Sequence, residues 1–424
     1  MKLPLLSSEF RKNTFRLLSA NVVSQAVALA IYPIVTRIYS PEEFGTFNLF
    51  LSICSIFFIL STGRYEYAIL LPKSDKDSAA VFRLCLRINT WFSLFLLMLI
   101  LLAEDQILLL FNNRSLEGSL YLIPILVFMN ALGIILTYWF NRYKRFDLTS
   151  RYTLTQNLGN SVLKILNGKL GYTKVGLIWA TIAGQILALF SVLFIKNKKY
   201  LFGRLKKTDN ERIKKVAQIY SNYPKYSMFN AFLNMFSGNL PTLMLIPFFG
   251  ERMIGFYALA ITAGFRPLNL ISGSLNQVLF QQISERYNQR KPILHIYTGF
   301  LKKGFLYLLP VFILIFLFSS PLVSFIFGSE WEETSTNLNI LLPWFFLTLF
   351  SGTFMFIPSI FFKQKMAMII QCFYFVSKVI VLVIGIYYNS YYLSMALYSS
   401  IGVLFLTLYL FWFYRILKRY EQNI

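Results

Sequence analysis

Arginine and lysine side chains stand inside long apolar runs of this 424-residue chain, and no carboxylate lies within those runs to neutralise them. Arg266 and Lys378 are the clearest cases, whereas Lys164 is close enough to the end of its run to reach an interface. Ionisable groups at membrane depth are costly and usually face a cavity or a partner. Because arginine's planar donors match phosphate oxygens, a cavity lined by these cations favours an anion and would repel cationic drugs.

Polar residues at helical spacing accompany these cations. Asn269, Gly273 and Asn276 follow Arg266 at i+3, i+7 and i+10, so the four residues share one helical face. The other stripes are Asn157, Asn160, Lys164 and Asn167; Gln371, Tyr374 and Lys378; Asn230, Asn234 and Ser237; and Asn21, Gln25 and Tyr32. Arg37 and Arg64, near span ends, are further candidates. The stripes fit one water-filled lumen; the alternative is hydrogen bonding between packed helices, which Asn and Gln also supply.

Twelve apolar segments would carry these residues, each near the ~20 helical residues that cross a ~30 Å hydrocarbon core. They are 14–37, 44–61, 86–103, 119–140, 152–168, 174–195, 226–249, 253–281, 303–327, 337–361, 366–387 and 391–414. The runs are too long for barrel strands and lack a period of two, so the backbone must be helical. Span 152–168 is short and polar, but without it the basic loop 196–225 would face outside.

Lysine and arginine crowd the even-numbered loops and both ends of the chain. About 33 of the 41 basic residues fall in loops that the positive-inside rule places in the cytoplasm. This rule accounts for the net charge of +23 without a nucleic-acid partner. We expect both termini in the cytoplasm, an N-terminal six-helix bundle (1–195), a basic cytoplasmic linker (196–225) and a C-terminal six-helix bundle (226–424). The sequence thus predicts an all-α integral membrane protein whose two bundles enclose a central cationic cavity.

Most catalytic chemistry is excluded by composition. Cys54, Cys85 and Cys372 make no metal-ligand spacing, and His295 is the only histidine, so neither a metal site nor a histidine-based triad is expected. No phosphate-binding loop of the GxxxxGK[ST] type occurs, so we expect no ATP hydrolysis. We also expect no cofactor and no enzymatic activity. Transport against a gradient would then need a proton or sodium gradient, or removal of the product outside. Glu66 is the candidate coupling residue; the alternative is a structural pair with Arg64.

Aromatic residues near the span ends have a simpler interpretation. Trp139, Trp331 and Trp344 are among those that we interpret as anchors at the membrane–water interface, where tryptophan is enriched.

Three stretches carry a family resemblance: Tyr39-Ser40-Pro41-Glu42-Glu43-Phe44-Gly45, Gly63-Arg64-Tyr65-Glu66-Tyr67-Ala68-Ile69-Leu70-Leu71-Pro72, and Gly176-Leu177-Ile178. They resemble O-antigen or capsule repeat-unit flippases of the polysaccharide transporter family, within the multidrug/oligosaccharidyl-lipid/polysaccharide exporter superfamily. The resemblance implies two bundles in a V, alternating access, and a location in the bacterial cytoplasmic (inner) membrane. It also implies an undecaprenyl-pyrophosphate-linked oligosaccharide as substrate, in lipopolysaccharide or capsule synthesis, with membrane lipids and a polysaccharide polymerase among the partners.

Two alternatives remain open. Drug or small-molecule exporters of the same architecture usually carry an acidic site in the first span, where this chain has Asn21 and Gln25. A membrane glycan polymerase or ligase usually displays a long outer loop, whereas the outer loops predicted here are short.

Overall fold

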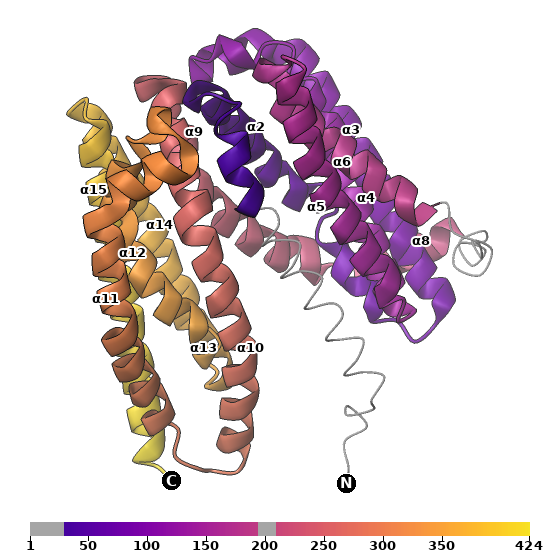
Figure 1. Cartoon of the computed structure of the whole chain (residues 1–424). Helices are drawn as coiled ribbons and strands as arrows, with labels where there is room; N and C mark the ends of the chain where they lie inside the picture. The colour runs from indigo at the N-terminus through magenta and orange to yellow at the C-terminus, as the bar shows by residue number, and fades with distance from the viewer. Residues whose placement is uncertain (1–28, 194–208) are drawn as a thin grey trace. The chain divides into compact units, whose positions relative to one another are not determined.

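The computed structural model describes residues 29–193 and 209–424, and within these ranges the chain is helical and contains no strand (Figure 1). The chain divides into two compact units, Met1–Pro247 and Phe248–Ile424. Helix is the expected outcome, because a helix satisfies its own backbone polar groups in lipid.

The membrane spans found in the described ranges agree with the segments predicted from the sequence. Nine helices of the described ranges are long and apolar enough to cross a membrane. One of these segments, Tyr223–Asn288, has 66 residues and contains two of the predicted spans. The polar fifth span lies in α5 (Phe146–Lys169), and the first span falls largely outside the described residues. Together with α5, these segments account for eleven of the twelve predicted spans within the described residues, and the protein is an all-α integral membrane protein.

The first unit is built from these elements: α2 (Pro41–Leu60), η2 (Tyr65–Leu70), α3 (Asp75–Phe111), η3 (Arg114–Leu116), α4 (Leu122–Arg142), α5, α6 (Thr173–Leu193), α8 (Asn210–Ile219), η5 (Tyr223–Ser227) and the start of α9 (Met228–Ala260). Its core gathers around Trp139 of α4, whose ring centroid lies 5.1 Å from that of Phe82 on α3. Helices α5 and α6 pack side by side along their length.

The start of α2 shows what the Ser-Pro-Glu-Glu stretch does. Ser40 is the N-cap, and its Oγ accepts from the backbone N–H of Glu43 at 3.3 Å. The Glu43 carboxylate in turn accepts from the backbone N–H of Ser40 at 3.0 Å, while Pro41 occupies the first helical turn. This capping box satisfies two of the amide groups that a helix start leaves without partners. The most specific part of the family resemblance is therefore a helix-start signal.

Helix α9 belongs to both units. Its first part packs on α2: Asn48 Nδ2 donates to Thr242 Oγ1 at 2.8 Å, and Asn239 Nδ2 donates to Ser55 Oγ at 3.0 Å. The helix breaks at Gly250, where φ is 78°, a left-handed value that glycine adopts without a Cβ clash. The break falls in the predicted gap between spans seven and eight. Residues Met228–Pro247 thus pack within the first compact unit, although the predicted C-terminal bundle begins at residue 226.

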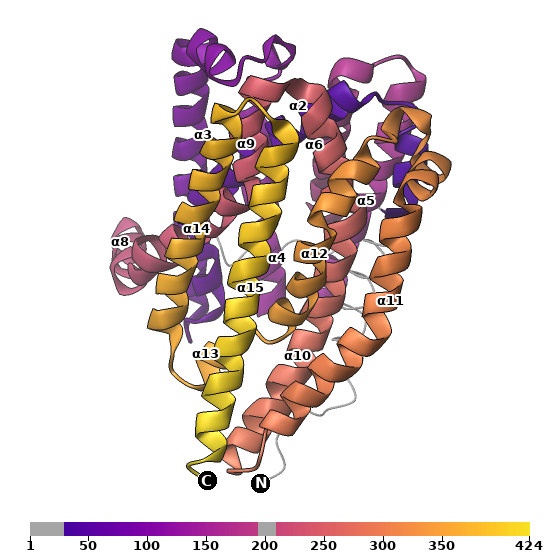
Figure 2. The ribbon, with the colours of Figure 1, turned by 90° about the vertical axis from the view of Figure 1, so that its left-hand side faces the viewer.

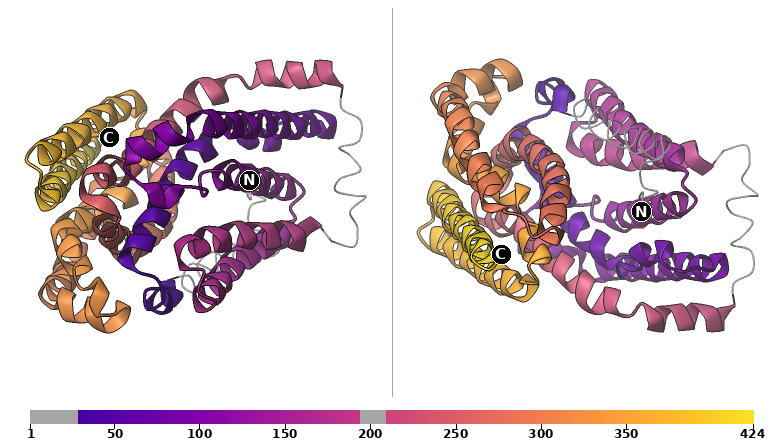
Figure 3. Two further views of the ribbon diagram at one scale, coloured as in Figure 1. Left: turned by 90° about the horizontal axis from the view of Figure 1, so that it is seen from above. Right: turned by 90° about the horizontal axis from the view of Figure 1, so that it is seen from below.

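The second unit contains the rest of α9, η6 (Ile261–Phe265), α10 (Arg266–Asn288), α11 (Leu294–Phe327), η7 (Ser329–Trp331), α12 (Thr334–Thr353), α13 (Ile357–Ile360), α14 (Gln364–Tyr387) and α15 (Tyr391–Glu421). Helices α14 and α15 lie side by side, as both the turned view and the end-on views show (Figures 2 and 3). Aromatic rings fill the core; Tyr297, for example, lies 4.7 Å from Phe354, centroid to centroid.

Candidate substrate-binding site

Lys378 lies in a cage of aromatic rings within the second unit. Its Nζ is 4.2 Å from the centroid of Tyr374 on α14, 5.0 Å from Tyr398 on α15 and 5.7 Å from Trp344 on α12. The residue is only 5 % exposed, so its side chain is buried among these rings and not in contact with bulk solvent. The rings attract the cation through their quadrupoles but carry no net charge to neutralise it.

Arg266 stands at the start of α10, directly after the π-helical turn η6. Arg266, Asn269 and Gly273 are all exposed, as expected for residues that share one helical face. The preceding Phe265 stacks on Trp344 with centroids 5.1 Å apart. Trp344 therefore contacts both the segment that positions Arg266 and the cage that holds Lys378.

The remaining member of the Arg266 stripe bonds to a neighbouring helix. Asn276 Nδ2 donates to the carbonyl oxygens of Gly352 and Thr353, at 3.0 and 3.2 Å, and so joins α10 to the end of α12. For this residue the structure favours the alternative of interhelical hydrogen bonding.

In the first unit, Lys164 is half-buried on α5. Its Nζ lies 4.9 Å from the ring of Phe47 on α2 and 5.9 Å from that of Tyr32. Its backbone carbonyl accepts from the Tyr39 hydroxyl at 2.8 Å. Lys164 therefore lies beside aromatic rings, as Lys378 does, but beside fewer of them. Arg37, in the turn before α2, is exposed.

The asparagines of α5 and α9 differ in their surroundings. Asn157 and Asn160 are half-buried, and Asn160 packs so closely on α6 that a Cβ added to Gly184 would lie 2.8 Å from its backbone nitrogen. Asn230 and Asn234 are exposed on α9, where Asn234 Nδ2 donates to Asn230 Oδ1 at 3.4 Å. Gln25 lies outside the described residues.

A buried polar network of the first unit escaped the sequence analysis. Gln185 of α6 donates to the carbonyl of Met129 on α4 at 3.0 Å and also bonds Tyr152 and Gln156 of α5. Gln185 is an isolated polar residue in an apolar run, and only that isolation could have marked it.

Glu66 is buried in η2, between α2 and α3, with 4 % of its surface exposed. The Thr62 hydroxyl donates to its carboxylate at 2.6 Å. Burial raises the pKa of Glu66 above its ordinary value, and the Thr62 hydrogen bond and the nearby Arg64 charge partly oppose this rise. Arg64 instead lies with its guanidinium carbon 4.4 Å from the Tyr67 ring, and among the described residues it forms no ion pair with Glu66.

The interpretation of three tryptophans as interface anchors is wrong. Trp139 and Trp331 are fully buried and Trp344 is 7 % exposed, so all three pack inside their units. An aromatic ring near a span end can face neighbouring helices as readily as lipid headgroups, and sequence position does not distinguish the two.

Comparison with known proteins identifies the family. The model of a family described as "Polysaccharide biosynthesis protein" matches residues 34–336, which is more than half of the chain. No curated protein matches the sequence.

Solved structures share the fold across nearly the whole chain. The lipid II flippase MurJ in an inward closed conformation is 16% identical with a TM-score of 0.70, over 96% of this chain and 90% of that one. An inward-facing multidrug-resistance MATE transporter of the MOP superfamily is 17% identical with a TM-score of 0.67, over 94% and 95%. A MOP-superfamily transporter from Pyrococcus furiosus, described as having a binding pocket of reverse polarity, is 17% identical with a TM-score of 0.57, over 97% and 96%. With this fold and the family match over residues 34–336, the chain belongs to the polysaccharide biosynthesis protein family of integral membrane proteins.

Proposed function

We propose that this protein is a flippase that moves an undecaprenyl-pyrophosphate-linked oligosaccharide across the bacterial cytoplasmic membrane by alternating access. Lys378, buried in a membrane-spanning helix under three aromatic rings, carries the proposal most directly. The family match supports a role in polysaccharide synthesis, and the lipid II flippase MurJ has the same fold.

The chemistry of the cage suits an anionic headgroup. A cation–π contact contributes ~0.5–2 kcal/mol, whereas a charge-assisted hydrogen bond contributes ~1.5–3 kcal/mol. A phosphate that reached Lys378 would therefore compete well with the rings for its ammonium. Arg266, exposed at the start of α10, offers the planar donors that bind phosphate oxygens in pairs.

Glu66 is the proposed coupling group. A buried carboxyl with a raised pKa takes up a proton more readily than an exposed one, and Thr62 can bond either form. Protonation would remove a negative charge beside Arg64, within the turn that joins α2 to α3. This change is of the kind that biases an equilibrium between two conformations.

Complementation tests the function. In a strain lacking the gene, Arg266→Ala and Lys378→Ala should each reduce surface polysaccharide by at least ~tenfold, the loss expected for a charge-assisted contact, at normal protein abundance. Lys365→Ala is the matched control, because Lys365 is exposed at the start of the same helix as Lys378. Full restoration of polysaccharide by both variants would reject the cationic site. A parent protein that exports cationic dyes but no glycan would favour the drug-exporter alternative.

A further inference from the structure

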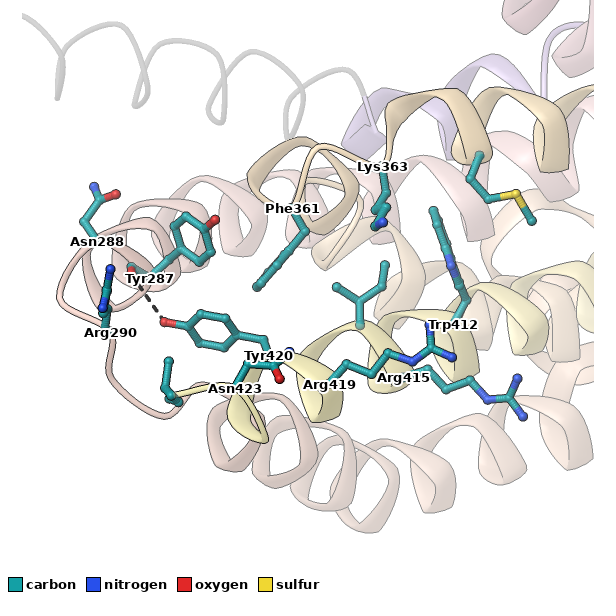
Figure 4. Close-up of a pocket in the computed structure, with 13 residues that line it drawn as sticks. Tyr287, Asn288, Arg290, Phe361, Lys363, Trp412, Arg415, Arg419, Tyr420 and Asn423 are labelled. Atoms are coloured by element: carbon teal, nitrogen blue, oxygen red, sulfur yellow. Dashed lines mark hydrogen bonds between the residues drawn. The ribbon is translucent and has the colours of Figure 1, made fainter.

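A basic pocket lies at one end of the second unit, away from the Lys378 cage along α14. Its volume is about 1030 Å³, and its walls come from the ends of α10 and α15 and from the turn between α13 and α14 (Figure 4). Three rings brace these elements: the centroid of Tyr287 lies 5.1 Å from that of Phe361 and 5.3 Å from that of Tyr420. The Tyr420 hydroxyl also donates to the Tyr287 carbonyl at 3.3 Å. The pocket is thus held by packing from three segments.

The charged side chains that line this pocket are all basic. Arg290, Lys363, Arg415 and Arg419 line it, and none of its 13 described lining residues is an aspartate or a glutamate. The nearby Glu421 is engaged elsewhere, because its Oε1 accepts the backbone N–H groups of Ile293 and Leu294 at 2.7 Å each. Four cationic side chains from three segments, with no acidic side chain among them, favour a ligand with one or two phosphates.

An apolar groove continues from the pocket along α14 and α15. It has a volume of about 440 Å³ and shares Trp412 and Arg415 with the basic pocket. Its other walls include Phe373, Leu408 and Phe411, which are 65%, 49% and 51% exposed. The guanidinium carbon of Arg415 lies 4.4 Å from the Phe411 ring, so this side chain covers the junction between the cationic and apolar parts.

The dimensions match one leaflet of a bilayer. Met366 lines the basic pocket and Ser377 the apolar groove, eleven positions further along α14. At ~1.5 Å per helical residue this separation is ~16 Å. Half of a ~30 Å hydrocarbon core is ~15 Å. An acyl chain in the groove would therefore reach about the middle of the membrane while its headgroup occupied the basic pocket.

We infer that this composite site binds an anionic glycerophospholipid of the membrane, with the phosphate among the four basic residues and an acyl chain along α14 and α15. Such a lipid matches both the charge and the length of the site. Basic pockets between membrane helices bind anionic headgroups in this way. The site is separate from the Lys378 cage, and its occupant does not depend on which glycan is transported.

Native mass spectrometry of the purified full-length protein, titrated with phosphatidylglycerol or phosphatidylcholine, tests the headgroup. Phosphatidylglycerol should bind preferentially, and the double variant Arg415→Gln/Arg419→Gln should weaken that binding by at least ~tenfold, as expected for losing charge-assisted contacts. Lys418→Gln is the matched control, since Lys418 lies on the same turn of α15 but outside the pocket. Equal losses in both variants would mean unspecific attraction to the helix end and would overturn the inference, as would unchanged binding in the double variant.

A second pair of variants tests the acyl chain. Leu408→Trp should fill the groove and weaken phosphatidylglycerol binding, whereas Leu404→Trp, at an exposed position one turn earlier on α15 and outside the groove, should not. Displacement of the lipid by glycerol 3-phosphate at equal concentration would indicate a site for a free phosphate. If undecaprenyl phosphate displaces phosphatidylglycerol but phosphatidylglycerol does not displace undecaprenyl phosphate, the site binds the carrier lipid. Either result would overturn the assignment, while retained lipid binding in a protein that moves no glycan would reject the proposed function alone.

Discussion

The ammonium of Lys378 lies 4.2 Å from the ring centroid of Tyr374, four residues earlier on α14, so one turn of helix supplies both the cation and the first wall of its cage. Tyr398 and Trp344 close the cage from two other helices. A buried lysine costs free energy through desolvation, and cation–π contacts offset only part of that cost. Such a residue is expected where function rather than stability requires it.

Lys378→Met should separate stability from transport. Methionine fills the same volume without a charge to desolvate, so we expect an unchanged or higher unfolding temperature in detergent. Glycan transport should fall by at least ~tenfold, because the contact to phosphate is lost. Parallel measurements of thermal unfolding and of surface polysaccharide check both effects. A clearly lower unfolding temperature would show that the lysine is a structural element.

Glu66→Gln should remove a pH dependence of stability. The pKa of Glu66 is raised in the folded state by burial, so the protonated form stabilises the fold and this contribution is lost as pH rises through the raised pKa. The unfolding temperature of the parent protein should therefore fall as pH increases above the ordinary glutamate range, and that of the variant should fall less. Thermal unfolding across a pH series measures the difference.

The same variant tests coupling in liposomes. If Glu66 relays protons, Glu66→Gln should bind substrate but no longer respond to an imposed pH gradient. An unchanged response to the gradient would leave Glu66 with a structural role only.

The membrane spans could be predicted from the sequence because hydropathy and loop charge are local properties. In the part of the chain that the structure describes, the nine candidate spans, the break at Gly250 and the helical but polar α5 all agree with the predicted segments. The same holds for the α2 start, where Ser40 and Glu43 carry a recognisable capping pattern.

The surroundings of the candidate residues could not be predicted, because they depend on packing between helices that are distant in sequence. Periodicity placed Asn276 on the Arg266 face, but it does not show that the carbonyls of Gly352 and Thr353 lie within reach. Nor does periodicity show that the Trp344 ring would form one side of the Lys378 cage. Helical spacing identifies a face and leaves its neighbours undetermined.

Topology offers a direct test of orientation. Reporter fusions after Asn210 and after Glu332 should give opposite signals, because the positive-inside bias places the first in the cytoplasm and the second outside. Equal signals at both positions would reject the arrangement of twelve spans with cytoplasmic termini.

The close approach of α5 and α6 gives a prediction about stability. A Cβ at Gly184 would lie 2.8 Å from the backbone nitrogen of Asn160, and backbone cannot move away as a flexible side chain can. Gly184→Ala should therefore push the two helices apart and destabilise the fold by ~1–3 kcal/mol, the usual cost of overpacking. The effect should appear as a lower unfolding temperature and lower abundance in the membrane.

Gly159→Ala is the matched control at the same helix pair. A Cβ there would meet Leu187 Cδ1 at 3.4 Å, Gly184 Cα at 3.7 Å and Leu187 Cβ at 4.0 Å, all ordinary contact distances. Alanine also has a higher helix propensity than glycine by ~1 kcal/mol, so this variant should be neutral or slightly stabilised. Equal unfolding temperatures for the two variants would contradict the tight packing of α6 on Asn160. A large loss for Gly184→Ala alone would establish that small residues on α6 let α5, with its lysine and asparagines, pack closely against it.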